Sequence, residues 1–253
     1  MVRRAREAKP LRTYGWIPDR PDGRDFLYRA IRKKVRLDKT VDLRAQCSRV
    51  EDQGNLGSCT ALALAGNIEF LDNRTDSEYA DVSRLFIYYN ERVIIDTVDY
   101  DSGAMLRDGI KTLKNDGVCP ERVWPYRIGK FKSKPPANCY KEAAGRRIAS
   151  YYRIASLDEM LNCLAEGFPF VFGFTVYESF ESPKTAQTGV VPMPQKSESP
   201  LGGHAVLAVG YHRKARRFII RNSWGAGWGM DGYGTMPFAY LEELGDDFWT
   251  IRK

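Results

Sequence analysis

The feature that most constrains the fold is an apolar run that begins at Cys59 and continues to Leu71. Alanine and leucine alternate over its first half, and the first charged residue in it is Glu69. A helix that is apolar on nearly all sides has to be covered on nearly all sides. We therefore expect this segment to form a buried helix at the centre of the protein, with other elements packed around it.

The residues before this helix place a thiol at its N-terminus. The run from Gln53 to Cys59 reads Gln-Gly-Asn-Leu-Gly-Ser-Cys, so a Gly-Ser turn leads directly into the helix. Unpaired backbone N–H groups and the positive end of the helix dipole favour the thiolate form of a cysteine at this position. Gln53 carries an amide donor that the loop could fold back over the sulfur. Cys59 is the candidate nucleophile, and an inert buried thiol is the weaker alternative.

The candidate general base is nearly fixed by composition, because the chain has two histidines. His212 lies in the charged stretch Tyr-His-Arg-Lys at 211–214, which we expect to be an exposed hairpin tip. His204 follows two glycines and begins a stretch with the pattern of a strand. His204 is therefore the expected base.

These motifs, together with Asn-Ser-Trp-Gly at 222–225, resemble the papain-like cysteine peptidases, and most closely their bacterial and viral branch. Residues 101–105 resemble the glycine-rich edge of that family's substrate cleft, and residues 247–251 resemble the C-terminal motif of the branch. The matches occur in the family's order between residues 42 and 251. The resemblance implies an α+β fold with two lobes, one helical and one an antiparallel β-barrel-like lobe, and an active-site cleft between them.

The resemblance also implies a thiol endopeptidase, a hydrolase that cleaves peptide bonds of a polypeptide through a covalent acyl-enzyme. Cys59 would be the nucleophile, His204 the base, and Asn222 the residue that orients the imidazole. The side-chain amide of Gln53 and the backbone N–H of Cys59 would form the oxyanion hole. Trp224 would shield the bond between histidine and asparagine from water.

The substrate-binding residues implied by the resemblance are Gly103, Met105, Gly173, Ala205 and Trp224. Met105, Gly173 and Ala205 would wall the second subsite, which suggests an apolar or aromatic side chain there. Gly103 would offer its backbone to the substrate as an added strand.

Three positions depart from the family pattern. Plant and animal members have a cysteine where this chain has Leu56, so a disulfide that anchors the nucleophile loop is absent. They have an aromatic residue where this chain has Thr60, and an aspartate or asparagine where it has Gly203. None of the three belongs to the expected reacting set, so activity is expected while the rigidity of the loop and the pH profile are open.

Two alternative functions are considered beside the peptidase. One is another acyl-transfer enzyme with the same triad, such as an amidase or a transglutaminase-like protein. The other is an inactive peptidase scaffold used for binding. The complete set of four candidate residues argues against the inactive scaffold, and the Gln-x₅-Cys spacing favours a peptidase.

The chain divides at about residue 38. Residues 1–38 are expected to be a basic N-terminal pro- or regulatory segment, either a removable propeptide, which would make the chain a zymogen, or a permanent clamp. Residues 39–253 are the expected peptidase domain, with a helical lobe over about 45–145 and a β lobe over about 146–253. Helical signals come first in this domain and strand-like runs follow, as an α+β protein requires.

The positive charge is concentrated at the N-terminus. Residues 1–36 contain 12 Lys/Arg and 4 Asp/Glu, while the remainder contains 27 and 28, so the net charge of +7 arises from the first segment. Such an arm could bind an anionic ligand, either a nucleotide or a polyanion, and the alternative is a solvated segment with incidental charge. We expect a monomer.

The remaining features point to no cofactor. No metal-binding spacing occurs, and no apolar stretch approaches the ~20 residues that span a bilayer. No signal-peptide pattern is visible, so we expect a cytoplasmic protein or one exported by a route that the sequence does not encode. Beside Cys59 there are four cysteines, at positions 47, 119, 139 and 163, which allow three pairings; Cys119 with Cys139 and free thiols are both considered.

Overall fold

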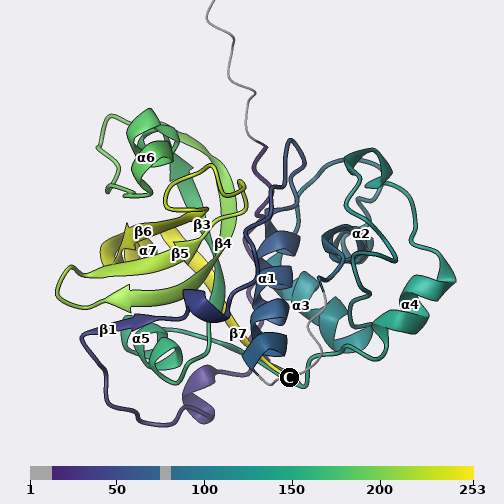
Figure 1. Ribbon diagram of the computed structural model, residues 1–253, viewed down its shortest axis with the longest axis horizontal. Coiled ribbons are helices and arrows are strands. Elements are labelled where there is room, and N and C mark those ends of the chain that lie inside the picture. The colour runs from purple at the N-terminus through teal and green to yellow at the C-terminus, as the bar shows by residue number, and fades with distance from the viewer. Residues whose placement is uncertain (1–12, 75–80) are drawn as a thin grey trace, which may run out of the picture.

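One helix lies at the centre of the molecule, buried along almost its whole length. The computed structural model describes residues 13–74 and 81–253. Helix α1 (Cys59–Arg74) is buried at every position from Cys59 to Asp72. It stands between a group of helices and a β-sheet, which cover it from opposite sides (Figure 1). The expected central helix is therefore confirmed, and the two lobes meet along it.

The helical side of α1 is formed by α2 (Arg84–Ile94), α3 (Leu106–Asn115) and α4 (Ala137–Ala143). The N-terminus of α2 is capped by Ser83, whose hydroxyl accepts from the backbone N–H of Phe86. Helix α3 ends before Gly117, which has a φ of 80°, a left-handed conformation that favours glycine. The helix in 137–143 was not expected, because the Lys/Pro-rich stretch before it obscures its period.

The other lobe is a seven-stranded sheet in which every pairing between named strands is antiparallel. Its main order is β2-β7-β3-β4-β5-β6, and β1 pairs with β4. The strands are β1 (Thr40–Asp42), β2 (Ser150–Arg153), β3 (Phe170–Tyr177), β4 (Pro200–His212), β5 (Arg217–Arg221), β6 (Tyr233–Pro237) and β7 (Gly245–Arg252). The antiparallel lobe is confirmed, but within the described residues the sheet is open and does not close into a barrel, because β2 and β6 remain its two ends.

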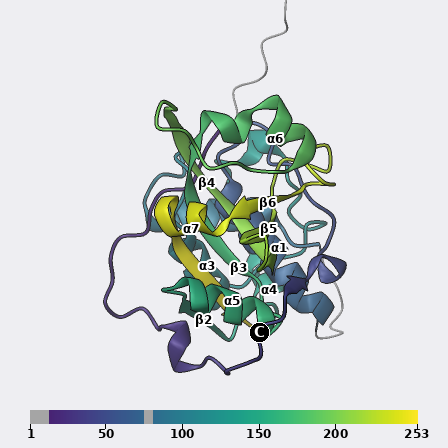
Figure 2. The ribbon, with the colours of Figure 1, turned by 90° about the vertical axis from the view of Figure 1, so that its left-hand side faces the viewer.

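Both faces of this sheet are covered, and the side chains alternate between the two faces as the strand period of two requires. Val171, Leu207 and Val209 pack in the same core as α1. Phe172 and Val206, which alternate with them along β3 and β4, point into a second core. Helices α5 (Leu157–Ala165) and α7 (Phe238–Leu244) contribute to that second core (Figure 2). Two covered faces explain why these strands are continuous apolar runs in the sequence.

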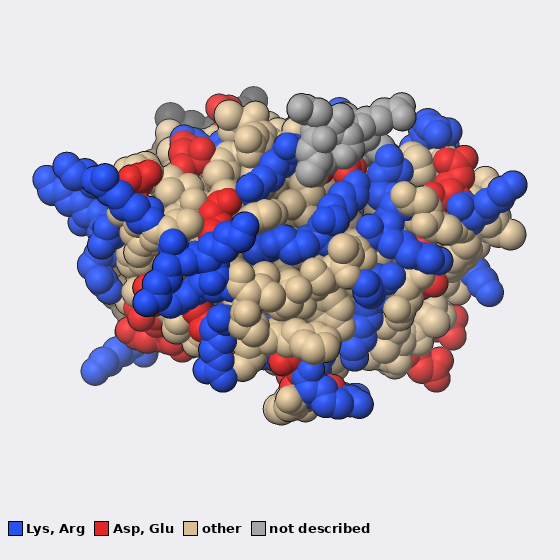
Figure 3. All heavy atoms as spheres, turned by 90° about the horizontal axis from the view of Figure 1, so that it is seen from below, with Lys and Arg blue, Asp and Glu red and all other residues tan. Residues whose placement is uncertain are grey.

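The N-terminal segment has little regular structure, as expected, yet it is built into both lobes. Trp16 forms a bridge with Ala104 of the helical lobe, and Leu27 forms one with Arg153 of β2. The segment then passes through the 3₁₀ turn η1 (Tyr28–Ala30), whose tyrosine is fully buried, and reaches β1 on the sheet. Figure 3, a view of the face where η1 and the C-terminus lie, shows lysine and arginine side chains in a band across it. Residues 1–12, which hold part of the basic charge, lie outside the described residues.

The five cysteines are free thiols in this structure. Cys119 and Cys139 are both buried and form a hydrogen bond with each other, so they lie where the expected pair would lie. Cys163 is packed in the second core.

Candidate active site

The fold places Cys59 at the seam between the two lobes. It is the first residue of α1, and its sulfur hydrogen-bonds with backbone N–H groups of Ala205 on β4, of Gly15 in the N-terminal segment and of Thr60. The side chain has no exposed surface. Burial raises the pKa of the Cys59 thiol to about 12 and outweighs these N–H groups, which lower it. Burial in the covered site therefore opposes the expected thiolate.

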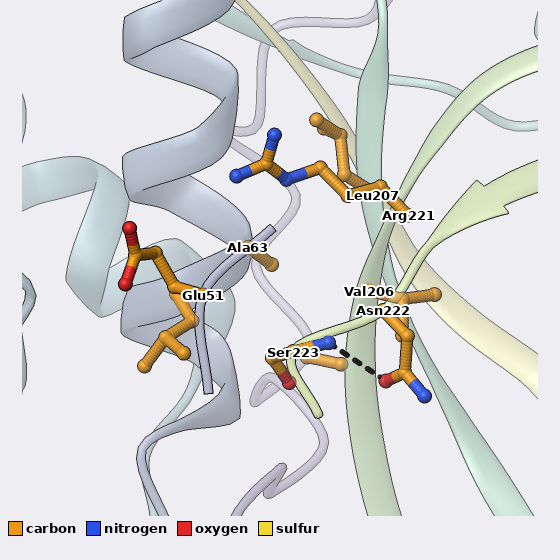
Figure 4. Close-up of a pocket in the computed structure, with 9 residues that line it drawn as sticks. Glu51, Ala63, Val206, Leu207, Arg221, Asn222 and Ser223 are labelled. Carbon is orange, nitrogen blue, oxygen red and sulfur yellow. Dashed lines mark hydrogen bonds between the residues drawn. The ribbon is translucent and has the colours of Figure 1, made fainter. Parts of the chain in front are cut away.

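His204 and Asn222 are brought together by two neighbouring strands. His204 lies in β4 opposite Phe174 of β3, and Asn222 follows the last residue of β5. Nε2 of His204 is 2.8 Å from Oδ1 of Asn222, and both side chains are buried. The same oxygen accepts from the backbone N–H of Ser223 at 2.8 Å, which turns the carbonyl end of the amide towards the ring (Figure 4). This contact favours the tautomer that carries its proton on Nε2.

Aromatic rings enclose the imidazole. The Trp224 ring lies 5.0 Å from the His204 ring at an interplanar angle of 31°. Phe174, Phe180 and Tyr14 approach the imidazole with ring separations of 5.7, 6.2 and 6.3 Å. The pair formed by His204 and Asn222 is thereby kept from water, which strengthens the bond between them.

Gln53 is fixed in the orientation that an oxyanion donor needs. Its Oε1 accepts from the Ser223 hydroxyl at 2.7 Å, so its Nε2 faces the other way. Nε2 donates to the carbonyl of Leu56 at 2.9 Å and to the carbonyl of Thr13 at 3.1 Å. The acceptor from the N-terminal segment is a peptide carbonyl, the group that an oxyanion hole is built to receive. Sequence reasoning missed Ser223, whose signal was its place directly after Asn222.

Asp101 holds the nucleophile loop. Its two oxygens accept from the backbone N–H of Gly57 at 3.1 and 3.0 Å, and Oδ1 also accepts from the Tyr88 hydroxyl. Tyr88 in turn accepts from the backbone N–H of Gly103 at 3.2 Å. One carboxylate therefore ties the loop before Cys59 to the expected substrate edge, in a chain that lacks the family's disulfide there. In the sequence, Asp101 is marked only by its place in the motif at 101–105.

The N-terminal segment runs through the cleft and bonds to both walls. Ala104 donates its N–H to the carbonyl of Gly15 at 2.7 Å and accepts from the N–H of Ile17 at 2.9 Å. Trp16 donates its N–H to the carbonyl of Gly203 at 2.9 Å. The approach is so close that a Cβ on Gly15 would lie 1.8 Å from the carbonyl oxygen of Gly57. The glycine in this segment is therefore required by its passage over the nucleophile loop.

The pairing of this segment with Ala104 is parallel. Ala104 bonds to residues 15 and 17, whereas a strand in antiparallel pairing would exchange both bonds at one residue. These two bonds thus fix the direction in which the N-terminal segment crosses the cleft.

The expected substrate-binding residues lie along this same passage. A Cβ on Gly103 would lie 2.2 Å from the Gly15 carbonyl oxygen, and a Cβ on Gly173 would lie 1.9 Å from the Trp16 ring. Ala205 is buried on β4 opposite Gly173, and Met105 follows Ala104 at the start of α3. His212 is at the far end of β4, where Nδ1 lies 3.4 Å from the Thr40 hydroxyl, so it is not part of the cleft.

Behind the site the lobes are closely packed. A cavity of about 10 Å³, which is about the space that one water molecule needs, lies between Ala63 of α1 and the residues Arg221, Asn222 and Ser223 (Figure 4). Access to Cys59 and His204 is therefore from the side that the N-terminal segment covers. Within residues 13–74 and 81–253, no group of three or more His, Cys, Asp or Glu side chains is arranged to hold a metal ion, and no helix is long and apolar enough to cross a membrane.

Comparisons with known proteins agree with this geometry. The family model described as papain family cysteine protease matches residues 37–241. An uncharacterized peptidase C1-like protein of Acanthamoeba polyphaga mimivirus is 41% identical, over 96% of this chain and 87% of that protein.

Solved structures agree as well. The crystal structure of xylellain, a cysteine protease from Xylella fastidiosa, superposes with a TM-score of 0.90 at 44% identity, covering 98% of this chain and 99% of xylellain. A procathepsin B from Trypanosoma congolense has a TM-score of 0.73 at 18% identity, with 96% and 87% of the two chains covered, and shows the same fold.

The bonds of Asp101 give a prediction about the nucleophile loop. Asp101→Ala should lower the free energy of unfolding by about 2–4 kcal/mol, because it leaves the Gly57 N–H and the Tyr88 hydroxyl without their acceptor. Asp101→Asn should cost less, since its amide oxygen can still accept. Denaturant unfolding measures both, and Asp99→Ala, an exposed neighbour in the same loop, should change the value by less than about 0.5 kcal/mol. Equal stability of Asp101→Ala and wild type would contradict the role of this carboxylate.

Proposed function

Because the chain belongs to the papain family of cysteine proteases, we propose that Cys59, His204, Asn222 and Gln53 carry its chemistry. The protein is a papain-like cysteine endopeptidase, a hydrolase that acts on polypeptides. Cys59 is the nucleophile, His204 the general base and acid, Asn222 the orienting residue and Gln53 an oxyanion donor. The observation that carries the assignment is the bond from Nε2 of Gln53 to the Thr13 carbonyl, since the amide that would bind an oxyanion already binds a peptide carbonyl.

The acylation step follows from these positions. His204 takes the thiol proton, the Cys59 sulfur adds to the carbonyl carbon, and the carbonyl electron pair moves to the oxygen. Nε2 of Gln53 and the backbone N–H of Cys59 stabilise that oxyanion. The C–N bond then breaks as His204 returns its proton to the amine, which leaves a thioester on Cys59.

Deacylation repeats the sequence with water. His204 takes a proton from water and the hydroxide adds to the thioester carbon; the C–S bond then breaks as His204 returns the proton to the sulfur, which releases the acid and restores the Cys59 thiol. Asn222 accepts from Nε2–H throughout, so the other ring nitrogen remains available for the proton. Trp224, whose ring lies 5.0 Å from the imidazole, keeps this bond away from water.

The two histidines provide the test of this assignment. His204→Ala should lower kcat/KM for a fluorogenic peptide substrate by about 10²–10⁴-fold, since a positioned general base contributes this much. The matched variant His212→Ala should leave kcat/KM within about twofold. Gln53→Ala should lower kcat by about 10²–10³-fold if it donates to the oxyanion, and Asn222→Ala should be milder.

The same assays separate the peptidase from its alternatives. An inactive scaffold would give no hydrolysis with the wild-type chain. An enzyme specialised in acyl transfer would pass the acyl group to an added amine in preference to water. A small effect of Gln53→Ala would make that residue a structural one and remove it from the oxyanion hole.

We further propose that the N-terminal segment suppresses this activity by occupying the cleft. It covers Cys59, accepts the Gln53 amide and uses both bonding groups of Ala104, so a substrate has no free edge to bind. Its pairing with Ala104 is parallel, so Ala104 bonds to two residues of the segment, Gly15 and Ile17. In an antiparallel pairing a single residue would form both bonds with Ala104. The segment thus occupies the bonding groups that a substrate strand would need, as an inhibitor does.

Two buried carboxylates hold the segment in place. Oδ2 of Asp247 accepts from the Trp16 indole at 3.1 Å and from the backbone N–H of Asp19 at 2.7 Å, and Asp19 accepts from the Trp249 indole at 2.8 Å. Burial, followed by the charge of Asp19, raises the pKa of Asp247 to about 7, and burial raises the pKa of Asp19. The charged groups around them are Arg107, Arg153, Asp25 and Asp246.

The sign of the resulting pH dependence follows from these shifts. A carboxyl whose pKa is higher in the covered state binds a proton more tightly there, so covering the cleft takes up protons. The cover, by which we mean the N-terminal segment bound in the cleft, receives this stabilisation in full below the ordinary aspartate pKa of about 4. It loses the stabilisation as the pH rises through about 7. Inhibition by the segment should therefore relax towards alkaline pH.

Trp16→Ala in the full chain tests the cover. Loss of this buried ring should weaken the cover and raise kcat/KM by about 10²-fold at pH 5.5, and the ratio of variant to wild type should fall towards one at pH 8. The matched control is Phe26→Ala, because Phe26 lies in the same segment with 71% of its surface exposed. Deletion of residues 1–38 is a poorer test, since it would remove the fully buried Tyr28 from the core.

Equal kcat/KM of Trp16→Ala and wild type at both pH values, with both proteins folded, would reject inhibition by the segment. If the ratio of kcat/KM of Trp16→Ala to that of wild type is large at both pH values, the segment inhibits the enzyme, but Asp19 and Asp247 do not control this inhibition.

A second proposal concerns the basic charge of the segment. Arg29, Lys33, Lys34 and Arg36 are exposed, on the stretch that follows the buried Tyr28. Figure 3 shows that basic side chains are frequent on this face of the molecule. We propose that a monomer of this protein binds a polyanion here, because clustered cations raise the local concentration of such a ligand.

Inorganic tripolyphosphate is a suitable probe for this surface. Lys33→Glu combined with Lys34→Glu should weaken its binding at least tenfold in calorimetric titration, and 0.5 M salt should abolish most of the affinity. The control is the same pair of changes at the exposed Lys184 and Lys196 in the β lobe. If the two double variants bind tripolyphosphate with equal affinity, binding depends only on the net charge of the protein, and the proposed polyanion site on this surface is rejected.

A further inference from the structure

The indole of Trp16 fills a pocket that exists because Gly173 and Gly203 have no side chains. A Cβ on Gly173 of β3 would lie 1.9 Å from this ring, and a Cβ on Gly203 of β4 would lie 2.8 Å from it. The Trp16 side chain is only 9% exposed. The pocket lies one residue from the nucleophile, because Gly15, the preceding residue, hydrogen-bonds with the Cys59 sulfur. Any chain that replaces the segment along Ala104 meets this pocket on the β wall of the cleft.

The pocket contains one carboxylate, that of Asp247. Its side chain has no exposed surface, and its backbone has a φ of 55°, where the pairing of β3 with β7 changes register. Such irregularities redirect a side chain out of the alternation of its strand. The strand geometry therefore aims Asp247 at the end of the indole, where Oδ2 accepts the N–H of Trp16 at 3.1 Å.

Both hydrogen bonds to Oδ2 of Asp247 come from the N-terminal segment, one from Trp16 and one from the backbone of Asp19. Oδ1 is approached by Nη2 of Arg153 at 3.3 Å, from β2 of the lobe itself. When the segment leaves, Oδ1 keeps its cationic partner and Oδ2 loses both donors. A pocket whose acceptor is unpaired disfavours a ligand that brings no donor to it.

We propose that Asp247 determines the substrate specificity of this enzyme by accepting the indole N–H of a tryptophan side chain in the pocket that Trp16 occupies. The proposal rests on the peptidase function proposed above. The sequence predicts an apolar or aromatic side chain in the subsite walled by Met105, Gly173 and Ala205, and the proposal restricts this preference to tryptophan. A phenyl ring would fit against the glycines but would leave Oδ2 of Asp247 without a donor. The group that Asp247 binds in this structure is the neutral indole N–H of Trp16, so a tryptophan side chain of a substrate would match the pocket in shape and in its donor.

The test uses two substrates that differ in one group. Both are acyl dipeptidyl coumarin amides with arginine next to the coumarin; one has tryptophan before it, and the other has 3-benzothienylalanine, in which sulfur replaces the indole N–H. In full-length Trp16→Ala, kcat/KM should be about 10- to 100-fold higher for the tryptophan substrate. This comparison needs no change at Asp247, so it holds even if a variant there fails to fold.

Asp247→Asn in the same background identifies the residue. Arg153 keeps the amide oxygen on its side, so the amide NH₂ faces the indole and the acceptor is lost. The preference for tryptophan should then fall to within about twofold. Asp246→Asn is the matched control, since Asp246 also bonds to Arg153 but is 58% exposed, and it should keep the preference.

The outcomes separate this inference from the function on which it rests. Equal kcat/KM for the two substrates in Trp16→Ala, where Asp247 is unchanged, would overturn the specificity role but would not contradict the proposed peptidase function. An unchanged preference in a folded Asp247→Asn enzyme would overturn it as well. Absence of hydrolysis of both substrates by every form would reject the proposed peptidase chemistry and this inference with it.

Discussion

The burial of α1 between two lobes is the constraint on which the rest of the structure depends. Every residue from Cys59 to Asp72 is covered, so a helical group and a sheet must close on it from opposite sides. The seam between them runs to the N-terminus of the helix, and there the first helical residue meets the backbone of β4 beside His204. The packing that stabilises the fold is therefore the packing that assembles the candidate catalytic residues.

The N-terminal segment changes the chemistry of this seam. With the segment in place, burial raises the pKa of Cys59 and removes the solvent that would stabilise a thiolate. The same segment forms hydrogen bonds with Gln53, Ala104 and Asp247, the groups that we propose a substrate uses. A helix N-terminus is therefore not sufficient to activate the thiol, because the desolvation by the cover is the larger effect.

The structure also shows how this chain manages without the family's disulfide at the nucleophile loop. Asp101 accepts from Gly57 and Tyr88, and Tyr88 reaches Gly103, so hydrogen bonds tie the loop to the edge of the cleft. The sequence revealed only the absence of the cysteine. It could not reveal the substitute, because an aspartate in a loop has many possible partners and only the three-dimensional contact selects one.

The sequence by itself determined the central helix, the order of helices before strands and the short list of reactive residues. These follow from local pattern and composition: an apolar run of helical length, short apolar runs typical of strands, and only two histidines to choose from. Only the tertiary structure decided that the sheet stays open, that Gly15 of the N-terminal segment lies against Cys59, and that Asp247 faces the Trp16 indole. Trp16 and Asp247 are 231 positions apart. Contacts of that kind depend on how the lobes close, which no local pattern encodes.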